Sequence, residues 1–93
     1  MSDRTSIRVT IRNRLGLHAR PAMSFVDLAS TAKSEVRVRR TDSDEVVDGK
    51  SIMQVMMRAA TQGTELEVTA EGPDASGILG KLKNLVEDGF GEE

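Results

Sequence analysis

The chain has 93 residues, with 13 Lys and Arg against 15 Asp and Glu and a formal net charge of −2, and nothing in this balance indicates general binding to nucleic acid or anionic membranes. The absence of cysteine excludes disulfides and thiolate metal sites. The length fits one domain over residues 1–93. No apolar signal segment or membrane span is visible, so we expect a cytoplasmic protein.

The first half of the chain predicts a strand, a helix and a β-hairpin. Alternating apolar and polar residues over 7–12 indicate a strand with one buried face. Apolar residues at helical spacing from Ala22 to Ala32 indicate a helix. Two further strands, 36–39 and 45–48, flank the turn-forming sequence TDSDE.

The second half predicts a helix, a strand and another helix, from the same two periodicities. Gly63 follows the first of these helices and can adopt the left-handed conformation that ends a helix. Residues 89–93 are expected to be frayed. The three elements are 52–59, 65–71 and the stretch between Asp74 and Gly89.

The element order is therefore β-α-β-β-α-β-α. Three helices on one face of a four-stranded antiparallel sheet would bury all the apolar stripes, so we expect an α+β open-faced β-sandwich. The first two strands have arginines on their wet faces and the last strand has glutamates. Placing the last strand between the first two would pair these opposite charges.

The segment NRLGLHARPA, residues 13–22, contains the only histidine. We expect His18 just before the first helix, with Pro21 in its first turn, where N–H groups have no intrahelical acceptor. The backbone N–H groups of Ala19 and Arg20 and the helix dipole then favour an anion, and the Arg20 guanidinium suits phosphate. A neutral imidazole can attack phosphorus beside such a cradle. The alternative is a solvent-exposed cap without chemistry.

The string GLHARPA, residues 16–22, resembles the active-site signature of HPr, the histidine-containing phosphocarrier family of the bacterial phosphoenolpyruvate-dependent phosphotransferase system. KSIMQVMM at 50–57 and QGTELEVTAEG at 62–72 resemble the second helix and fourth strand of that family. The resemblance implies that His18 is phosphorylated on Nδ1 by the phosphohistidine of Enzyme I, and that Arg20 contacts the phosphate. It further implies transfer to a histidine or cysteine of an Enzyme IIA or IIB sugar-permease domain. Such a protein is a carrier, not an enzyme by itself, a monomer without cofactor or metal.

Methionines form a second pattern on the predicted helices. Helical spacing leaves Met23, Met53 and Met57 pointing away from the core, with Ile52 and Met56 at its border. Exposed methionines suit an adaptable docking surface, and a looser core is the alternative. Because the family docks its partners on these helices, the resemblance implies a partner interface of Leu17, Ala19, Met23, Ile52, Met53 and Met56.

Ser51 follows the sequence GK at 49–50, which suggests a phosphate-binding loop. That motif requires a glycine where the chain has Asp44, so we reject it. We predict that Ser51 is the N-cap of the second helix. The resemblance implies a further role, regulatory phosphorylation by an HPr kinase/phosphorylase, which would add negative charge to the docking surface and slow transfer to His18.

Two other classes of function remain to be weighed. A regulatory paralogue would share the phosphorylation chemistry but signal nitrogen or carbon status by binding, without sugar transport. A hydrolase or metalloenzyme is disfavoured, because the chain has one histidine, no cysteine and no acidic cluster with metal-ligand spacing.

Overall fold

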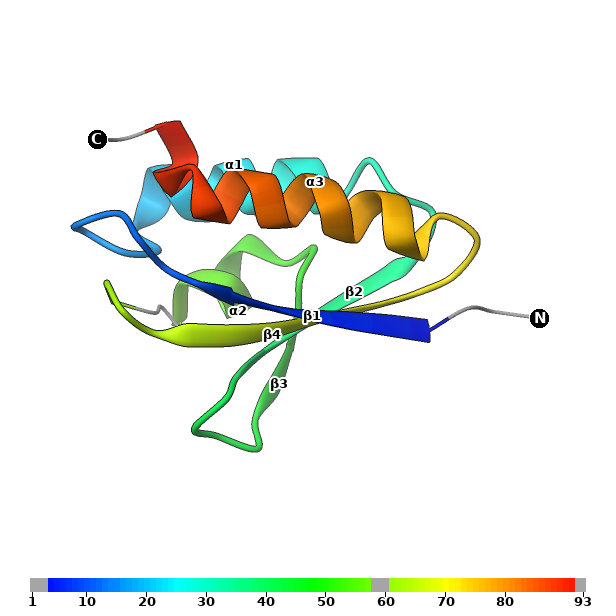
Figure 1. Cartoon of the computed structure of the whole chain (residues 1–93), viewed down its shortest axis with the longest axis horizontal. Coiled ribbons are helices and arrows are strands. Elements are labelled where there is room, and N and C mark those ends of the chain that lie inside the picture. The colour runs from blue at the N-terminus through cyan, green and yellow to red at the C-terminus, as the bar shows by residue number, and fades with distance from the viewer. Residues whose placement is uncertain (1–3, 58–60, 92–93) are drawn as a thin grey trace.

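The computed structural model describes residues 4–57 and 61–91, and its elements follow the predicted order (Figure 1). The predicted end of the second helix, at residue 59, lies outside the described residues. In chain order the elements are β1 (Arg4–Thr10), α1 (Ala19–Ala29), β2 (Glu35–Arg40), β3 (Val46–Asp48), α2 (Ile52–Met57), β4 (Glu65–Glu71), α3 (Ala75–Glu87) and the 3₁₀ turn η1 (Gly89–Gly91).

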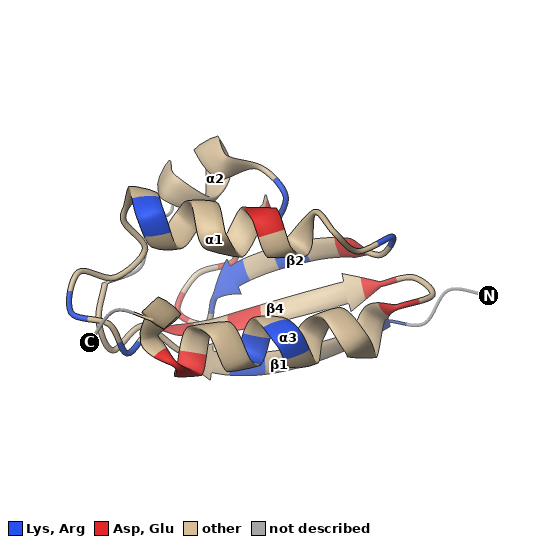
Figure 2. Cartoon of the chain, turned by 90° about the horizontal axis from the view of Figure 1, so that it is seen from above, with Lys and Arg blue, Asp and Glu red and all other residues tan. Residues whose placement is uncertain are grey.

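Within the described residues the strands form one antiparallel sheet in the order β1-β4-β2-β3. The helices cover one face of this sheet, and α1 and α3 lie side by side when seen from above (Figures 1 and 2). This is the predicted α+β open-faced β-sandwich. The central place of β4 is also confirmed, and Arg39 of β2 forms an ion pair of 3.1 Å with Glu67 of β4 on the wet face.

The core between sheet and helices is almost entirely aliphatic. Its single buried aromatic ring within the described residues is that of Phe25, on the predicted apolar stripe of α1. Ile11 lies beyond the end of β1 but is buried too, because its N–H donates to the Thr64 carbonyl (2.9 Å) and its own carbonyl accepts from Gly63 N–H (2.8 Å). These bonds hold the segment that leads to His18 against the sheet.

Asp74 precedes α3, as predicted, but its side chain makes no capping hydrogen bond to that helix. Its carboxylate instead accepts hydrogen bonds from the Ser34 hydroxyl and from the N–H groups of Lys33 and Ser34. The Ser34 hydroxyl first, and then the Lys33 N–H, lower the pKa of Asp74 to about 2. Gly72 must be glycine here, because its φ is +148° and a Cβ would lie 2.6 Å from Ser34 Oγ.

The C-terminal end differs from the expectation. Gly89 follows α3 with a φ of +65°, as a helix stop does, but residues 89–91 form η1. Phe90 packs against the core, and Gly89 is buried. The prediction of a frayed tail from residue 89 is therefore wrong for 89–91, because the Phe90 ring is apolar surface that the core can cover. No helix of the described residues is long and apolar enough to cross a bilayer.

Candidate functional site

His18 is the N-cap residue of α1, as predicted. Its backbone is extended (φ −76°, ψ −171°), and its carbonyl accepts the first helical hydrogen bond, from Ala22 N–H at 3.0 Å. The imidazole is half-buried and makes no capping hydrogen bond to the helix. The ring is therefore neither enclosed in the core nor used as a helix cap.

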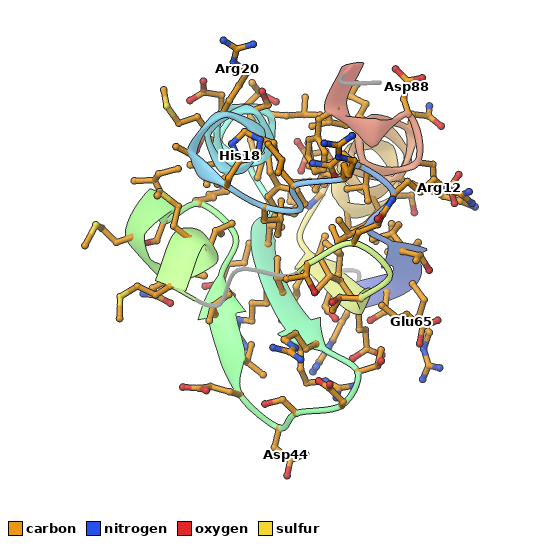
Figure 3. The ribbon with its side chains drawn as sticks, turned by 90° about the vertical axis from the view of Figure 1, so that its left-hand side faces the viewer. Arg12, His18, Arg20, Asp44, Glu65 and Asp88 are labelled. Carbon is orange, nitrogen blue, oxygen red and sulfur yellow. The ribbon has the colours of Figure 1, made fainter. Side chains whose placement is uncertain are left out.

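The start of α1 has the electrostatics that an anion requires. Pro21 has no N–H, and the N–H groups of Ala19 and Arg20 precede the first helical hydrogen bond, so they have no intrahelical acceptor. The first turn contains no acidic residue that would neutralise the positive end of the helix dipole. Ala19 and Arg20 are exposed, and the Arg20 guanidinium lies at the same end of α1 as His18 (Figure 3).

The loop before His18 is closed by a turn that sequence reasoning missed. Asn13 is buried; its Nδ2 donates to the Gly16 carbonyl at 2.7 Å, and Gly16 N–H donates back to the Asn13 carbonyl at 3.1 Å. Gly16 has a φ of +67°, which favours glycine. The spacing Asn-x-x-Gly is a turn signal that could have predicted this role. Asn13 therefore positions the segment that presents His18.

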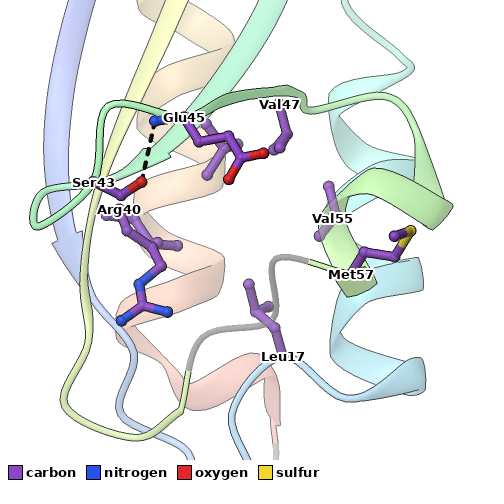
Figure 4. A pocket seen from close by; sticks show the side chains of 9 residues that line it. Leu17, Arg40, Ser43, Glu45, Val47, Val55 and Met57 are labelled. Carbon is purple, nitrogen blue, oxygen red and sulfur yellow. Dashed lines mark hydrogen bonds between the residues drawn. The ribbon is translucent and has the colours of Figure 1, made fainter.

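Leu17 is a correction to the predicted partner interface. Its side chain is 3 % exposed and belongs to the core, so it cannot contact a partner. Its apolar side chain is stabilised by removal from water, so it anchors the segment before His18 in the core. Leu17 lines a pocket of about 200 Å³ together with Val47 and Val55. Figure 4 shows these side chains around the pocket.

The predicted methionines are at the surface. Met23 is 54 % exposed, Met53 66 % and Met56 38 %, whereas Ile52 is half-buried. Met57, which was left out of the predicted interface, is 68 % exposed. We call Met23, Met53, Met56 and Met57 the methionine surface. It spans α1 and α2, which pack against each other, and the looser core that was the alternative is excluded.

Ser51 is the N-cap of α2, as predicted. Its hydroxyl accepts from Gln54 N–H at 3.3 Å, and its carbonyl accepts from Val55 N–H at 3.0 Å. The Gln54 side chain reaches back to accept from Asp48 N–H at 2.9 Å, and the Asp48 carboxylate accepts from Lys50 N–H at 3.0 Å. These bonds hold the Ser51 hydroxyl in one place at the start of the helix.

The chain matches one protein family over nearly its whole length. Residues 5–88 match the model of the family described as "PTS HPr component phosphorylation site". The chain belongs to the HPr family. Members of this family are phosphocarriers of the phosphotransferase system, and the function implied by GLHARPA is thereby confirmed at that level.

Individual relatives agree with this membership. The phosphocarrier protein HPr of Pseudomonas aeruginosa is 45 % identical over 87 residues, which are 94 % of this chain and 96 % of that protein. The phosphocarrier protein NPr of Proteus mirabilis is 37 % identical over 92 % of this chain and 94 % of that protein. The crystal structure of HPr-C-His from Thermoanaerobacter tengcongensis has a TM-score of 0.89 and 38 % identity, covering 96 % of this chain and 98 % of that one.

Proposed function

We propose that His18 is the residue on which this HPr-family phosphocarrier receives its phosphoryl group. The donor is the phosphohistidine of Enzyme I, and the acceptor is a histidine or cysteine of an Enzyme IIA or IIB domain. Nδ1 of His18 attacks phosphorus; the new N–P bond forms as the N–P bond of the donor breaks, and the donor imidazole leaves with the electron pair. The observation that supports this proposal most is the place of the single histidine at the start of α1.

The groups around His18 supply what the transferred phosphoryl group needs. The N–H groups of Ala19 and Arg20 can donate to its oxygens, and the helix dipole contributes about 0.3–1 kcal/mol in an exposed site. The Arg20 guanidinium can add charge-assisted hydrogen bonds. Because these interactions favour the group only when it is on His18, they hold it for transfer without a metal or cofactor of this chain.

The partners dock, in this proposal, on the methionine surface together with Ala19 and Ile52. Methionine side chains are flexible and polarisable, so they can fit surfaces of different shape in turn. A small apolar surface around a charged centre suits a monomeric carrier that must leave each partner after transfer.

The test of His18 is direct phosphorylation. The full chain is incubated with Enzyme I, Mg²⁺ and phosphoenolpyruvate, and its mass and peptides are analysed. We expect one acid-labile phosphoryl group that is absent from His18→Ala, with the matched variant Asn84→Ala, on an exposed turn of α3, still phosphorylated. Phosphorylation that persists in His18→Ala would contradict the assignment.

We also propose Ser51 as a regulatory phosphosite for an HPr kinase/phosphorylase. Its hydroxyl lies at the start of α2, two residues before Met53 of the methionine surface. A phosphate there would add a charge of about −1.5 to −2 beside the docking surface and slow transfer to His18. Ser51→Asp should therefore lower the rate of His18 phosphorylation by about tenfold, with Ser51→Ala close to wild type. Equal rates for the two variants would count against this role.

A regulatory paralogue without sugar transport is the second candidate, because the relative from Proteus mirabilis is a phosphocarrier protein named NPr. Both candidates share phosphorylation of His18. Expression in a strain that lacks its own sugar-system carrier separates them: restored sugar uptake supports the sugar branch, and a phosphorylated protein without restored uptake supports the regulatory one.

A further inference from the structure

Helix α1 has two charged side chains, Arg20 in its first turn and Asp27 two turns later. Both are exposed. A separation of seven residues is about two helical turns, so they share one side of the helix, about 10 Å apart along its axis. Figure 2 shows them as the blue and the red band of α1.

Within the part of the chain that the structure describes, the Asp27 carboxylate has no ion pair or side-chain hydrogen bond. No Lys or Arg in residues 4–57 and 61–91 forms an ion pair with it. On the sheet, by contrast, arginines such as Arg39 and Arg40 pair with carboxylates. Lys50, at the entrance to α2, is held elsewhere, since its Nζ donates to the Ala32 carbonyl at 2.9 Å. Asp27 is therefore an acidic group that solvent, or a partner, must satisfy.

Asp27 also lies on the side of α1 that adjoins the methionine surface. Its neighbour one turn before is Met23, at the i, i+4 spacing that places side chains next to each other. The core side of α1 is formed by Phe25 and Ala29, and Leu28 points into the groove towards α3. One ridge of α1 therefore has a positive, an apolar and a negative side chain in sequence order, those of Arg20, Met23 and Asp27.

We propose that Asp27 is a specificity-determining docking residue for the phosphoryl donor. This inference rests on the proposed function of His18. When the phosphoryl group lies against His18 and Arg20, the donor surface around that group lies along the ridge of α1. The donor that fits this ridge has a Lys or Arg opposite Asp27, about 10 Å along α1 from Arg20. A donor with a carboxylate at that place would be rejected by like charge.

The test is the steady-state phosphorylation of the full chain by Enzyme I of the same organism, with Mg²⁺ and phosphoenolpyruvate at low salt. We expect Asp27→Asn to raise the KM for the carrier about threefold, the loss of one exposed ion pair. Asp27→Lys should raise it about tenfold, because attraction becomes repulsion. In both variants kcat should be unchanged. The difference in KM between variant and wild type should become smaller at high salt, because exposed charges are screened.

The matched control is Asp44→Lys. Asp44 is an exposed carboxylate in the turn between β2 and β3, at the opposite end of the molecule from Arg20 (Figure 3), and the substitution changes the net charge equally. Its KM should stay within about twofold of wild type, since Asp44 lies on the turn between β2 and β3 and not on the ridge of α1 that faces the donor. A Lys or Arg on Enzyme I whose reversal to Glu restores the KM of Asp27→Lys would support the inference.

A KM of Asp27→Lys equal to that of Asp44→Lys would overturn the inference while the wild-type chain is still phosphorylated on His18. An effect seen only with the acceptor domain, or only on kcat, would overturn it too. A wild-type chain that Enzyme I does not phosphorylate would overturn the proposed function and this inference with it. If Asp27→Lys fails to fold, the isosteric Asp27→Asn decides by its KM alone.

Discussion

At the scale of single residues, the site depends on a histidine whose surroundings are built by its own segment. His18 begins α1, Asn13 and Gly16 close the turn before it, and Leu17 anchors the segment in the core. Arg20 is the one charged side chain in the first turn of the helix. The residues that position His18 therefore lie within a few positions of it in the sequence.

Arg20→Ala should slow phosphoryl transfer more than it weakens partner binding. The guanidinium contacts the phosphoryl group only when that group is at His18, so its loss should lower the single-turnover rate by about tenfold to a hundredfold, the range for a hydrogen bond to a charged group. Rapid-quench kinetics with Enzyme I measure this rate. Arg12→Ala removes the same charge from the neighbouring loop (Figure 3) and should change it by less than about threefold. Unchanged kinetics in Arg20→Ala would remove Arg20 from the site.

Asp74 should make the stability of the fold depend on acid pH. Its pKa is lowered to about 2 in the folded protein, chiefly by the Ser34 hydroxyl, while an unfolded aspartate titrates near about 3.9. A lowered folded pKa stabilises the protein above the unfolded pKa, and this contribution is lost as pH falls from about 4 to about 2.

Urea denaturation of Asp74→Asn at several pH values checks this expectation. The variant should be less stable than wild type at pH 7, because an amide cannot accept as the carboxylate does. The difference in the free energy of unfolding between wild type and Asp74→Asn should become smaller as the pH falls from about 4 to about 2. Asp44→Asn, at an exposed turn residue, should follow the wild-type curve throughout. A stability difference that stays constant over this pH range would show that the charge of the Asp74 carboxylate does not stabilise the fold.

At the scale of elements, α2 combines a buried and an exposed face within six residues. Val55 packs in the core, whereas Met53 and Met57 are exposed. The helix begins where Ser51 and Gln54 fix the chain by hydrogen bonds. The apolar surface of α2 is therefore presented by a well-anchored element.

Met53→Glu should impair docking and leave the fold intact. The side chain is exposed, so a carboxylate there stays solvated in the free protein but would be desolvated against a partner. We expect the KM for the carrier in phosphorylation by Enzyme I to rise by about tenfold or more. Val46→Glu is the matched control, since Val46 is also an exposed apolar residue but lies on β3 and not on α1 or α2. A normal KM for Met53→Glu would count against the methionine surface.

Glycine-to-alanine substitutions should have opposite effects in two elements. A Cβ on Gly49 would lie 2.7 Å from Val36 Cγ1, so Gly49→Ala should destabilise the protein by about 1–3 kcal/mol through overpacking. Nothing lies within 4 Å of a Cβ on Gly80 in α3, so Gly80→Ala should stabilise it by about 0.8–1 kcal/mol through helix propensity. Urea denaturation measures both, and a Gly49→Ala variant at least as stable as wild type would contradict the contact with Val36.

At the scale of the whole molecule, the sheet brings the charged strands together as their sequences predict. Arginines of β1 and β2 face glutamates of β4, which lies between them, and the ion pairs of Arg8 and Arg39 cross these two boundaries. Helices close the other face, so one layer of aliphatic side chains forms the core. His18 and the methionine surface lie at the helical side, and the hairpin turn at Asp44 lies at the far end (Figure 3).

The element order, the buried stripe of α1 and the place of His18 before that helix could all be predicted from the amino-acid sequence. Each of these features follows from residues that are close together in the sequence, through periodicity, capping and turn signals. The HPr resemblance of GLHARPA is likewise local, and the family match bears it out.

Three features depend on the packing of distant segments: Leu17 belongs to the core rather than to the interface, Phe90 packs against the core, and Asp74 binds Ser34 instead of capping α3. Ser34 and Asp74 are 40 residues apart, and a local sequence pattern cannot predict a hydrogen bond over that separation. Burial and hydrogen bonding between distant segments depend on which surfaces meet, and this is set only when the helices pack on the sheet.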